Sequence, residues 1–239
     1  MTAIRTTLLA ILGLTIAQPL LTADGPTKRT AKEALQSLND LIGSWRGTGV
    51  PAGTREEQQR GFWTETVAWG WQFKGADAWL VVDFAKGKHF EGGELRYLID
   101  KDLFQLTLRT PTKENLTFTG QVKDRVLTLE RQDDKTKETQ RLVFTLLHFE
   151  RHLYRLDVRP SGKSFFSRAY QVGATREGVA FAKGDGRPEC IVSGGLGTTP
   201  VSYMGQTYYV CCSGCRTEFN ADPAKYVKEY LAKKAKGGK

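Results

Sequence analysis

From Trp45 to about Phe181, apolar and polar residues alternate with a period of two, and turn-forming residues interrupt the alternation at short intervals. Strands that bury one face and expose the other produce this pattern, and its most regular stretches are residues 104–109, 116–119 and 154–159. The turns divide the region into about ten short strands, and a sheet of that size tends to close on itself to remove its edges. The sequence therefore predicts an antiparallel β-barrel.

The barrel domain is assigned to residues 31–183 and is expected to begin with a short helix over residues 31–42. Apolar residues recur there at helical spacing, and Gly43 follows them; they are Ala34, Leu35, Leu38, Leu41 and Ile42. Clusters of turn residues predict where consecutive strands end, at residues 74–77, 86–88, 100–102, 111–114, 123–125, 133–137 and 160–163.

The junction between this helix and the first strand carries a G-x-W-x-G-x-G motif, with Gly43, Trp45, Gly47 and Gly49 at the fixed positions. Together with the strand pattern, the motif resembles the opening of lipocalin-like barrels, including those related to nitrobindin. This resemblance implies a barrel whose interior holds an apolar small molecule or haem.

Along one expected strand the odd positions form an aromatic face that Glu65 interrupts. Ligand sites combine apolar walls with a few polar groups, so Glu65, Trp69 and Trp71 are the candidate ligand-binding residues. A position of Glu65 at the barrel rim, or a pairing with an interior arginine, is the other interpretation. For haem, the nitrobindin resemblance implies a histidine ligand, for which His148 and His152 are the strand-end options. They flank a short turn, however, and this predicts a solvent-exposed pair.

Residues 1–23 have the layout of a secretory signal, with Arg5, an apolar run over residues 8–17, and small residues that allow cleavage after Ala17 or Ala23. The run is about half as long as a segment that spans a bilayer, so no stable membrane anchor is expected. Export to the periplasm or secretion is predicted. Thiols in such a compartment oxidise unless a metal ion or a reductant protects them.

The net charge of +9 raises the question of nucleic-acid binding, which depends on where the charge lies. Six lysines after Ala224 oppose Glu229, so more than half of the net charge lies at the C-terminus. Little remains for a basic face elsewhere, and no nucleic-acid partner is expected. Residues 234–239 are interpreted as a solubilising lysine-rich tail, with a polyanion-binding tail as the alternative.

All four cysteines lie near the C-terminus, in the spacing C-x20-C-C-x2-C. Cys212 and Cys215 form a C-x-x-C knuckle with Gly214 before the second thiol, and Cys211 and Cys215 share one face if a helix begins there. Cys190 would come from a strand across a hairpin. Thiolates at this spacing suit Zn²⁺ or Cu⁺, and the sequence leaves the identity of the ion open.

The segments around these thiols resemble the YHS domain and the related TRASH metal-sensing domain. Residues 190–194 resemble the family's opening C-P-V-S-G, residues 200–212 its hairpin, and residues 215–226 its C-x-x-x-F-x-x-D-P-x-x-Y ending. The resemblance implies a small metal-binding domain, assigned to residues 187–233. In the TRASH form the metal ligands would be Cys190, Cys211 and Cys215, with Cys212 as the fourth candidate.

Two alternatives to metal binding stay open. Oxidation would pair Cys190 with one of the other three cysteines in a structural disulfide, and a C-x-x-C pair can also be redox-active. The redox alternative lacks its usual context, a helix that follows a buried strand in a βαβ unit. Met204, in the expected hairpin, is interpreted as packing at a turn; a thioether close to the thiolates would instead favour Cu⁺.

Asp222 and Pro223 predict the start of a last helix. Its apolar stripe is expected to pack on the hairpin through Tyr208 and Phe219; the stripe consists of Tyr226, Val227, Tyr230 and Leu231. A domain this small has little core of its own, so a metal ion or a disulfide would be needed to stabilise it.

No motif typical of an enzyme is found: the sequence has no G-x-S-x-G elbow, phosphate loop or H-E-x-x-H. The leading hypothesis is an exported, non-enzymatic, mainly β protein. In it, an antiparallel lipocalin-like barrel precedes a small α+β, cysteine-rich YHS-type domain that captures, senses or delivers a soft metal ion. The alternative hypothesis is a carrier of an apolar small molecule or haem, in which the cysteine module is purely structural. The sequence identifies no protein partner.

Overall fold

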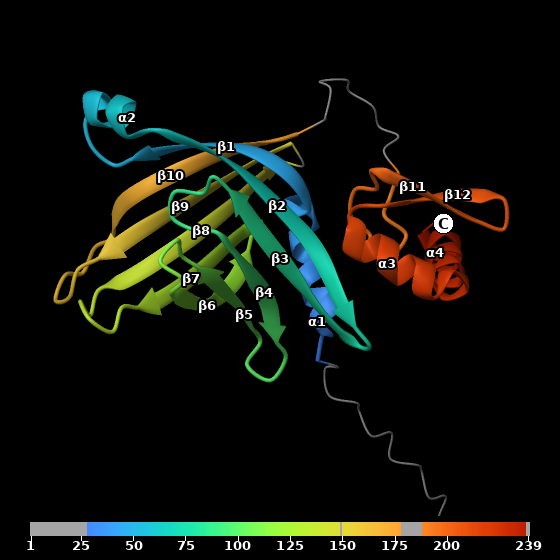
Figure 1. Ribbon diagram of the computed structural model, residues 1–239. Coiled ribbons are helices and arrows are strands. Elements are labelled where there is room, and N and C mark those ends of the chain that lie inside the picture. Colours follow the sequence, from blue (N-terminus) through green and yellow to red (C-terminus); the bar gives the residue numbers. More distant parts are fainter. Residues whose placement is uncertain (1–27, 149, 178–187, 238–239) are drawn as a thin grey trace, which may run out of the picture.

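The computed structural model describes residues 28–148, 150–177 and 188–237. Within these ranges, ten antiparallel strands pair in sequence order, and β1 pairs with β10 to close a barrel (Figure 1). The predicted fold class is confirmed, and each predicted turn falls at the junction of two strands. The strands are β1 (Gly43–Pro51), β2 (Trp63–Lys74), β3 (Asp77–Ala85), β4 (Gly92–Leu98), β5 (Leu103–Arg109), β6 (Asn115–Lys123), β7 (Val126–Gln132), β8 (Thr139–His148), β9 (Arg151–Arg159) and β10 (Ser167–Arg176).

Each of the four sequence assignments includes residues that the structure does not describe. The predicted signal segment, residues 1–23, lies wholly outside the described residues. The same holds for the end of the barrel assignment, residues 178–183, for residue 187 at the start of the metal-binding domain, and for residues 238–239 of the tail. Across the described ranges, no helix combines the length and the apolar character needed to span a membrane.

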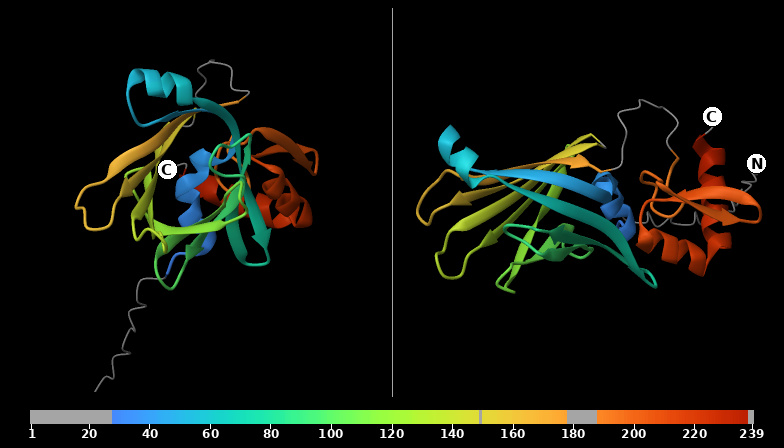
Figure 2. Two further views of the ribbon diagram at one scale, coloured as in Figure 1. Left: turned by 60° about the vertical axis from the view of Figure 1, so that its left-hand side comes forward. Right: turned by 45° about the horizontal axis from the view of Figure 1, so that its top comes forward.

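A helical plug, α1 (Ala31–Leu35) with the 3-10 helix η1 (Gln36–Leu41), covers one end of the barrel (Figure 2). Thr30 and Glu33 form a capping box that fixes the start of α1. The Ser37 hydroxyl donates to the carbonyl oxygen of Ala34 at 2.7 Å, and such side-chain bonds compete with the α-helical ladder. The predicted single helix is therefore split into an α-helical and a 3-10 part, which together bury Ala34, Leu35, Leu38 and Leu41.

Barrel side chains hold the three carbonyl groups at the end of this plug. The Trp45 indole N–H donates to the carbonyl oxygen of Leu41 at 2.7 Å. The Arg176 guanidinium donates to the carbonyl oxygens of Ile42 and Asp40, the latter at 2.9 Å, and lies 4.2 Å from the centre of the Trp45 ring. Helix-terminal carbonyls have no partner within the helix, so these contacts fix the plug to β1 and β10. They give Trp45, the aromatic residue of the opening motif, a structural role in this chain.

Aromatic side chains fill the interior of the barrel, and a carboxylate lies among them. Glu65 is 3% exposed and accepts hydrogen bonds from the Tyr154 hydroxyl and, at 2.9 Å, from the Trp63 indole. Phe144 stacks on Tyr154 with the ring centres 5.5 Å apart. Glu65 thus points inward and has two aromatic partners, so the interpretation that placed it at the rim or with an arginine is wrong. The indole and phenol donors make this buried position possible without a cation.

The prediction of an exposed histidine pair is wrong for His152, which is 1% exposed. Strand β9 begins at Arg151, so His152 already lies on the inward face of the strand and not in the turn. Its ring meets Trp45 edge to face at 4.4 Å, and neither ring nitrogen has a hydrogen-bond partner among the described residues. The side chain of His148 lies outside the described part of the chain.

Burial of His152 is expected to make the barrel sensitive to mild acid. Burial, with a smaller contribution from Arg176, lowers the pKa of His152 from 6.5 to about 3, so the unfolded chain binds a proton that the folded barrel excludes. Stability is therefore lost as the pH falls below 6.5, by about 2 kcal/mol between pH 7 and pH 5. Chemical denaturation at both pH values should show this loss. His152→Phe should abolish it, because phenylalanine does not bind a proton, and the substitution removes no hydrogen bond from the folded barrel. An equal loss in both proteins would assign the acid sensitivity to other groups.

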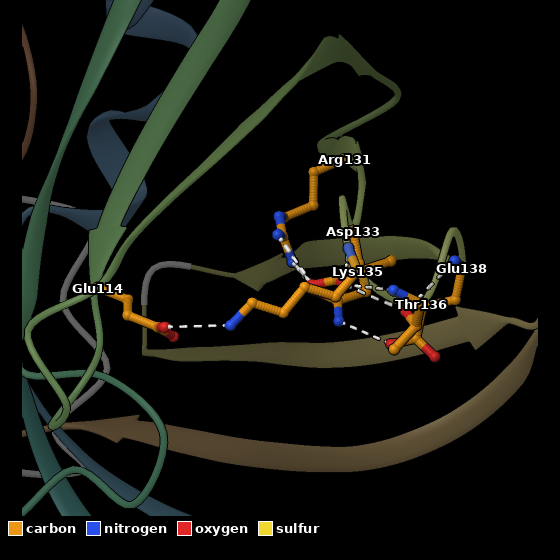
Figure 3. Close-up of polar contacts among 7 residues, drawn as sticks. Glu114, Arg131, Asp133, Lys135, Thr136 and Glu138 are labelled. Carbon is orange, nitrogen blue, oxygen red and sulfur yellow. Dashed lines mark hydrogen bonds and ion pairs between the residues drawn. The ribbon is translucent and has the colours of Figure 1, made fainter.

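The β7–β8 hairpin shows how a side chain specifies one of the predicted turns. Asp133 accepts hydrogen bonds from the backbone N–H groups of Lys135 and Thr136 at 3.0 and 2.9 Å, and Arg131 pairs with the same carboxylate at 3.2 Å (Figure 3). These bonds, led by the one from Thr136, lower the pKa of Asp133 to about 2. An aspartate that bonds its own following backbone is typical of turns, and here it fixes the register of the two strands.

One helix in the barrel domain departs from the predicted alternation. Helix α2 (Arg55–Gly61) lies between β1 and β2, and none of its residues is buried. Thr54 and Glu57 form a second capping box at its start. The T-x-x-E spacing is visible in the sequence and is the signal that could have predicted this helix.

The C-terminal module, residues 188–237, is a small hairpin with two helices: β11 (Thr199–Tyr203), β12 (Gln206–Val210), α3 (Ser213–Ala221) and α4 (Pro223–Gly237). It lies beside the plugged end of the barrel, next to α1 and β2 (Figures 1 and 2). Asp222 accepts a hydrogen bond from the backbone N–H of Lys225 at 3.1 Å, which confirms the predicted start of the last helix. That helix runs to Gly237, so residues 234–237 of the predicted tail are helical.

The predicted packing of the last helix on the hairpin is confirmed for Tyr230, whose ring centre lies 6.2 Å from that of Tyr208. Tyr208 also meets Phe219 of α3 at 6.3 Å, and Tyr226 is buried. Leu231 is 54% exposed and lies outside this contact.

Candidate metal centre

Three of the four thiols converge in the interior of the C-terminal module. The backbone of Cys190 forms an isolated β-bridge with Tyr209 of β12. Cys211 follows β12 directly, and Cys215 lies in the first turn of α3. Their sulfur atoms all lie within 4.8 Å of one another, and the three residues are 1%, 7% and 0% exposed. The hairpin and the helix thus bring together the three cysteines that the sequence ranks first.

The spacing of the sulfurs fits a shared ion better than a covalent bond. The sulfurs of Cys211 and Cys215 are 3.5 Å apart, and those of Cys211 and Cys212 are 3.9 Å apart. Two sulfurs that each lie about 2.3 Å from one metal ion have separations of this size, whereas a disulfide bond is about 2.05 Å long. All four cysteines are free thiols in this structure.

A tight turn after Cys190 supplies polar contacts to the sulfurs. Gly194 adopts a positive φ of 75° there, and the backbone N–H of Ser193 lies 3.5 Å from the sulfur of Cys190. The Ser193 hydroxyl lies 3.4 Å from the sulfur of Cys211. Backbone and hydroxyl donors of this kind stabilise a negatively charged sulfur.

The thiols cannot all ionise without a cation. Hydrogen bonds from Cys211 and Cys215 lower the pKa of Cys190, and the same contacts with Cys190 raise the pKa of both donors well above the usual range. Burial raises the pKa of these two thiols further. A soft cation among the three sulfurs would remove this conflict, because its charge favours every thiolate at once.

Cys212 lies between the three-thiol group and the barrel and contacts both. Strand β1 pairs with β2 only as far as Gly43 and Trp69, so the edge of β2 beyond that point has no strand neighbour among the described residues. The backbone N–H of Trp71 on this edge donates to the sulfur of Cys212 at 3.3 Å. Gly214 packs so closely on the carbonyl oxygen of Trp71 that a Cβ atom would lie 1.7 Å from it. The start of α3 therefore covers the open edge of a barrel strand.

The helical plug holds the other side of the same module. Gln36 and Asn39 both donate side-chain hydrogen bonds to the carbonyl oxygen of Ser193, at 3.0 and 2.9 Å. Asn39 also accepts a hydrogen bond from the Trp71 indole at 3.1 Å. Sequence reasoning missed these positioning residues, because a polar residue on a short helix gives no signal that distinguishes such a contact from solvent exposure.

The remaining candidates do not belong to the three-thiol group. Met204 is 85% exposed at the tip of the β11–β12 hairpin, which the length of β12 places on the order of 20 Å from Cys211. It neither packs at the turn nor approaches the thiolates, so both interpretations of Met204 are wrong. The side chains of Glu65, Trp69 and Trp71 are all buried, and that of Trp71 contacts the plug through Asn39. The role of these three residues in binding a ligand stays a prediction.

A family model of the YHS domain matches residues 199–230. The matched segment contains Cys211, Cys212 and Cys215 and begins after Cys190. A comparison with curated proteins gave no match. The YHS match and the cysteine cluster together indicate metal binding, with the ion undetermined.

Proposed function

We propose that this chain is an exported, non-enzymatic protein that binds one soft metal ion, Zn²⁺ or Cu⁺, for capture, sensing or delivery. The observation that carries the proposal is the convergence of three buried sulfurs, from Cys190, Cys211 and Cys215, within 4.8 Å of one another. Without an ion, the proximity of three buried thiols adds little to the stability of the fold, whereas thiolate ligands suit both ions well. Export is supported by the layout of residues 1–23.

The barrel contributes rigidity to this site. It bonds the module through Trp71 and through the plug residues Gln36 and Asn39. A metal site retains its geometry when neighbouring groups fix the ligand-bearing segments. We therefore assign the barrel a supporting role, and the proposal does not depend on a ligand in its interior.

The double variant Cys211→Ser, Cys215→Ser is expected to contain no metal, because a single remaining thiol of the group cannot hold a soft ion. The C-terminal module should also lose its fold, since the ion supplies much of its stability. Native and denaturing intact mass, with elemental analysis of protein recovered from its export compartment, measures both the bound ion and removal of the signal.

Ser202→Ala, at an exposed position of β11, is the matched control and should keep one ion per chain. Metal content equal to wild type in the double cysteine variant would overturn the proposed site. A wild-type mass that lacks hydrogens and carries no metal would favour disulfides instead.

A further inference from the structure

The three converging thiols are almost inaccessible, which raises the question of how an ion reaches them. Cys190, Cys211 and Cys215 are all buried, whereas Cys212 is only half-buried. Its sulfur lies 3.9 Å from that of Cys211, which in turn lies 3.5 Å from that of Cys215. A continuous row of sulfurs therefore connects the least buried of the four cysteines to the buried group.

Cys212 does not belong to the set of mutually close sulfurs, although it is adjacent in sequence to one of them. The N–H of Trp71 holds its sulfur against the barrel, on the side of Cys211 that faces β2. Four sulfurs around one tetrahedral ion would all need to be mutually close, at about 3.8 Å for bonds of 2.3 Å. Cys212 meets this spacing with Cys211, but it is outside the group of three sulfurs that all lie within 4.8 Å of one another.

We propose that Cys212 is the entry ligand of the metal centre, which receives the ion from a thiol or chelator complex and passes it to Cys211, Cys215 and Cys190. This inference rests on the proposed function. The sulfur of Cys212 forms a bond to the ion as one donor ligand leaves. The sulfur of Cys211 then binds as the next donor ligand leaves, and the bonds to Cys215 and Cys190 form as any remaining donor ligands leave and the bond to Cys212 breaks. Each thiol that binds releases its proton to solvent, Cys212 takes up a proton when its bond breaks, and the oxidation state of the ion is unchanged.

The contact with Trp71 suits a transient ligand. It holds the sulfur of Cys212 at a fixed place beside the buried group, because the donor is a backbone N–H on a barrel strand. Stepwise ligand exchange needs successive donors within bonding reach of one ion, and the two short sulfur separations provide it. Direct entry would instead require the module to open around three buried residues.

The test compares uptake by wild type and Cys212→Ser under anaerobic conditions. The probes are Cu⁺ presented as its bicinchoninate complex and Zn²⁺ presented with pyridylazoresorcinol, and stopped-flow absorbance follows the loss of each complex. We expect Cys212→Ser to bind one ion per chain at equilibrium but to load about tenfold more slowly than wild type. Ser213→Ala, the exposed neighbour in the same turn, should load at the wild-type rate.

A Cys212→Ser protein that loads as fast as wild type would overturn the entry role. One that folds but holds no ion would make Cys212 a permanent ligand, which also overturns it. Wild-type protein that takes up neither ion would overturn the proposed function itself, an outcome distinct from both.

A second measurement uses the wild-type fold and therefore does not depend on the variant. Brief treatment of the metal-free protein with iodoacetamide, followed by peptide mapping, should show Cys212 as the first cysteine modified. Protein alkylated only there should load as slowly as Cys212→Ser. First modification of Cys190, Cys211 or Cys215 would contradict the proposed order of access.

Discussion

Gly214→Ala is expected to detach the start of α3 from the barrel and to weaken the metal centre. A Cβ atom at this position would lie 1.7 Å from the carbonyl oxygen of Trp71 and 2.7 Å from its carbonyl carbon, so two backbone segments must move apart. Because neither neighbour is a flexible side chain, we expect a loss of about 3 kcal/mol in the stability of the module. Denaturant titration, with metal content measured in parallel, tests both effects.

Gly70→Ala provides the matched control on the other side of the same interface. A Cβ atom at Gly70 would meet the Cβ of Cys212 at 3.9 Å and Val81 at 4.0 Å, which are ordinary contacts. This variant should keep both its stability and its ion. If Gly214→Ala unfolds at the same denaturant concentration as Gly70→Ala and holds one ion, the close packing of α3 on β2 does not support the centre.

The effect of Gly214 also shows what the sequence could and could not predict about the site. The spacing of Cys190, Cys211 and Cys215 predicts their convergence, because a strand, a hairpin and the first turn of a helix place them on one side of a small domain. The same spacing says nothing of Trp71, which is distant in sequence and contacts Cys212 through its backbone. A backbone donor leaves no side-chain pattern to detect.

In the barrel, too, some features could be predicted from the sequence and others could not. Alternation and turn residues predict a closed sheet well, since both depend on local sequence and on the general cost of exposed strand edges. His152 and α2 were missed for different reasons. His152 lies at the very start of β9, where a shift of one or two residues in the strand boundary reverses exposure and burial. Helix α2 has no buried face, so only its capping box marks it.

Arg176→Ala is expected to cause the other large effect, a loss of about 4 kcal/mol in barrel stability. The variant removes the donor to the carbonyl oxygens of Asp40 and Ile42 and the cation that covers the ring of Trp45. Loss of a buried charged donor costs more than a surface contact, because the polar groups left behind stay desolvated. Chemical denaturation followed by tryptophan fluorescence measures the loss, and Arg168→Ala, an exposed arginine on the same strand, should change little.

Arg176→Ala should also weaken the metal centre, because the plug connects Arg176 to the C-terminal module. Arg176 holds the end of η1, and Asn39 of η1 donates to the carbonyl oxygen of Ser193, whose hydroxyl lies 3.4 Å from the sulfur of Cys211. A looser plug therefore frees the turn between Cys190 and Ser193, and the ion should be lost to a competing chelator faster than from wild type. If Arg176→Ala destabilises the barrel but releases the ion at the wild-type rate, the hold of Arg176 on the plug does not support the centre, and the contacts of Cys212 and Gly214 with β2 become the supporting ones.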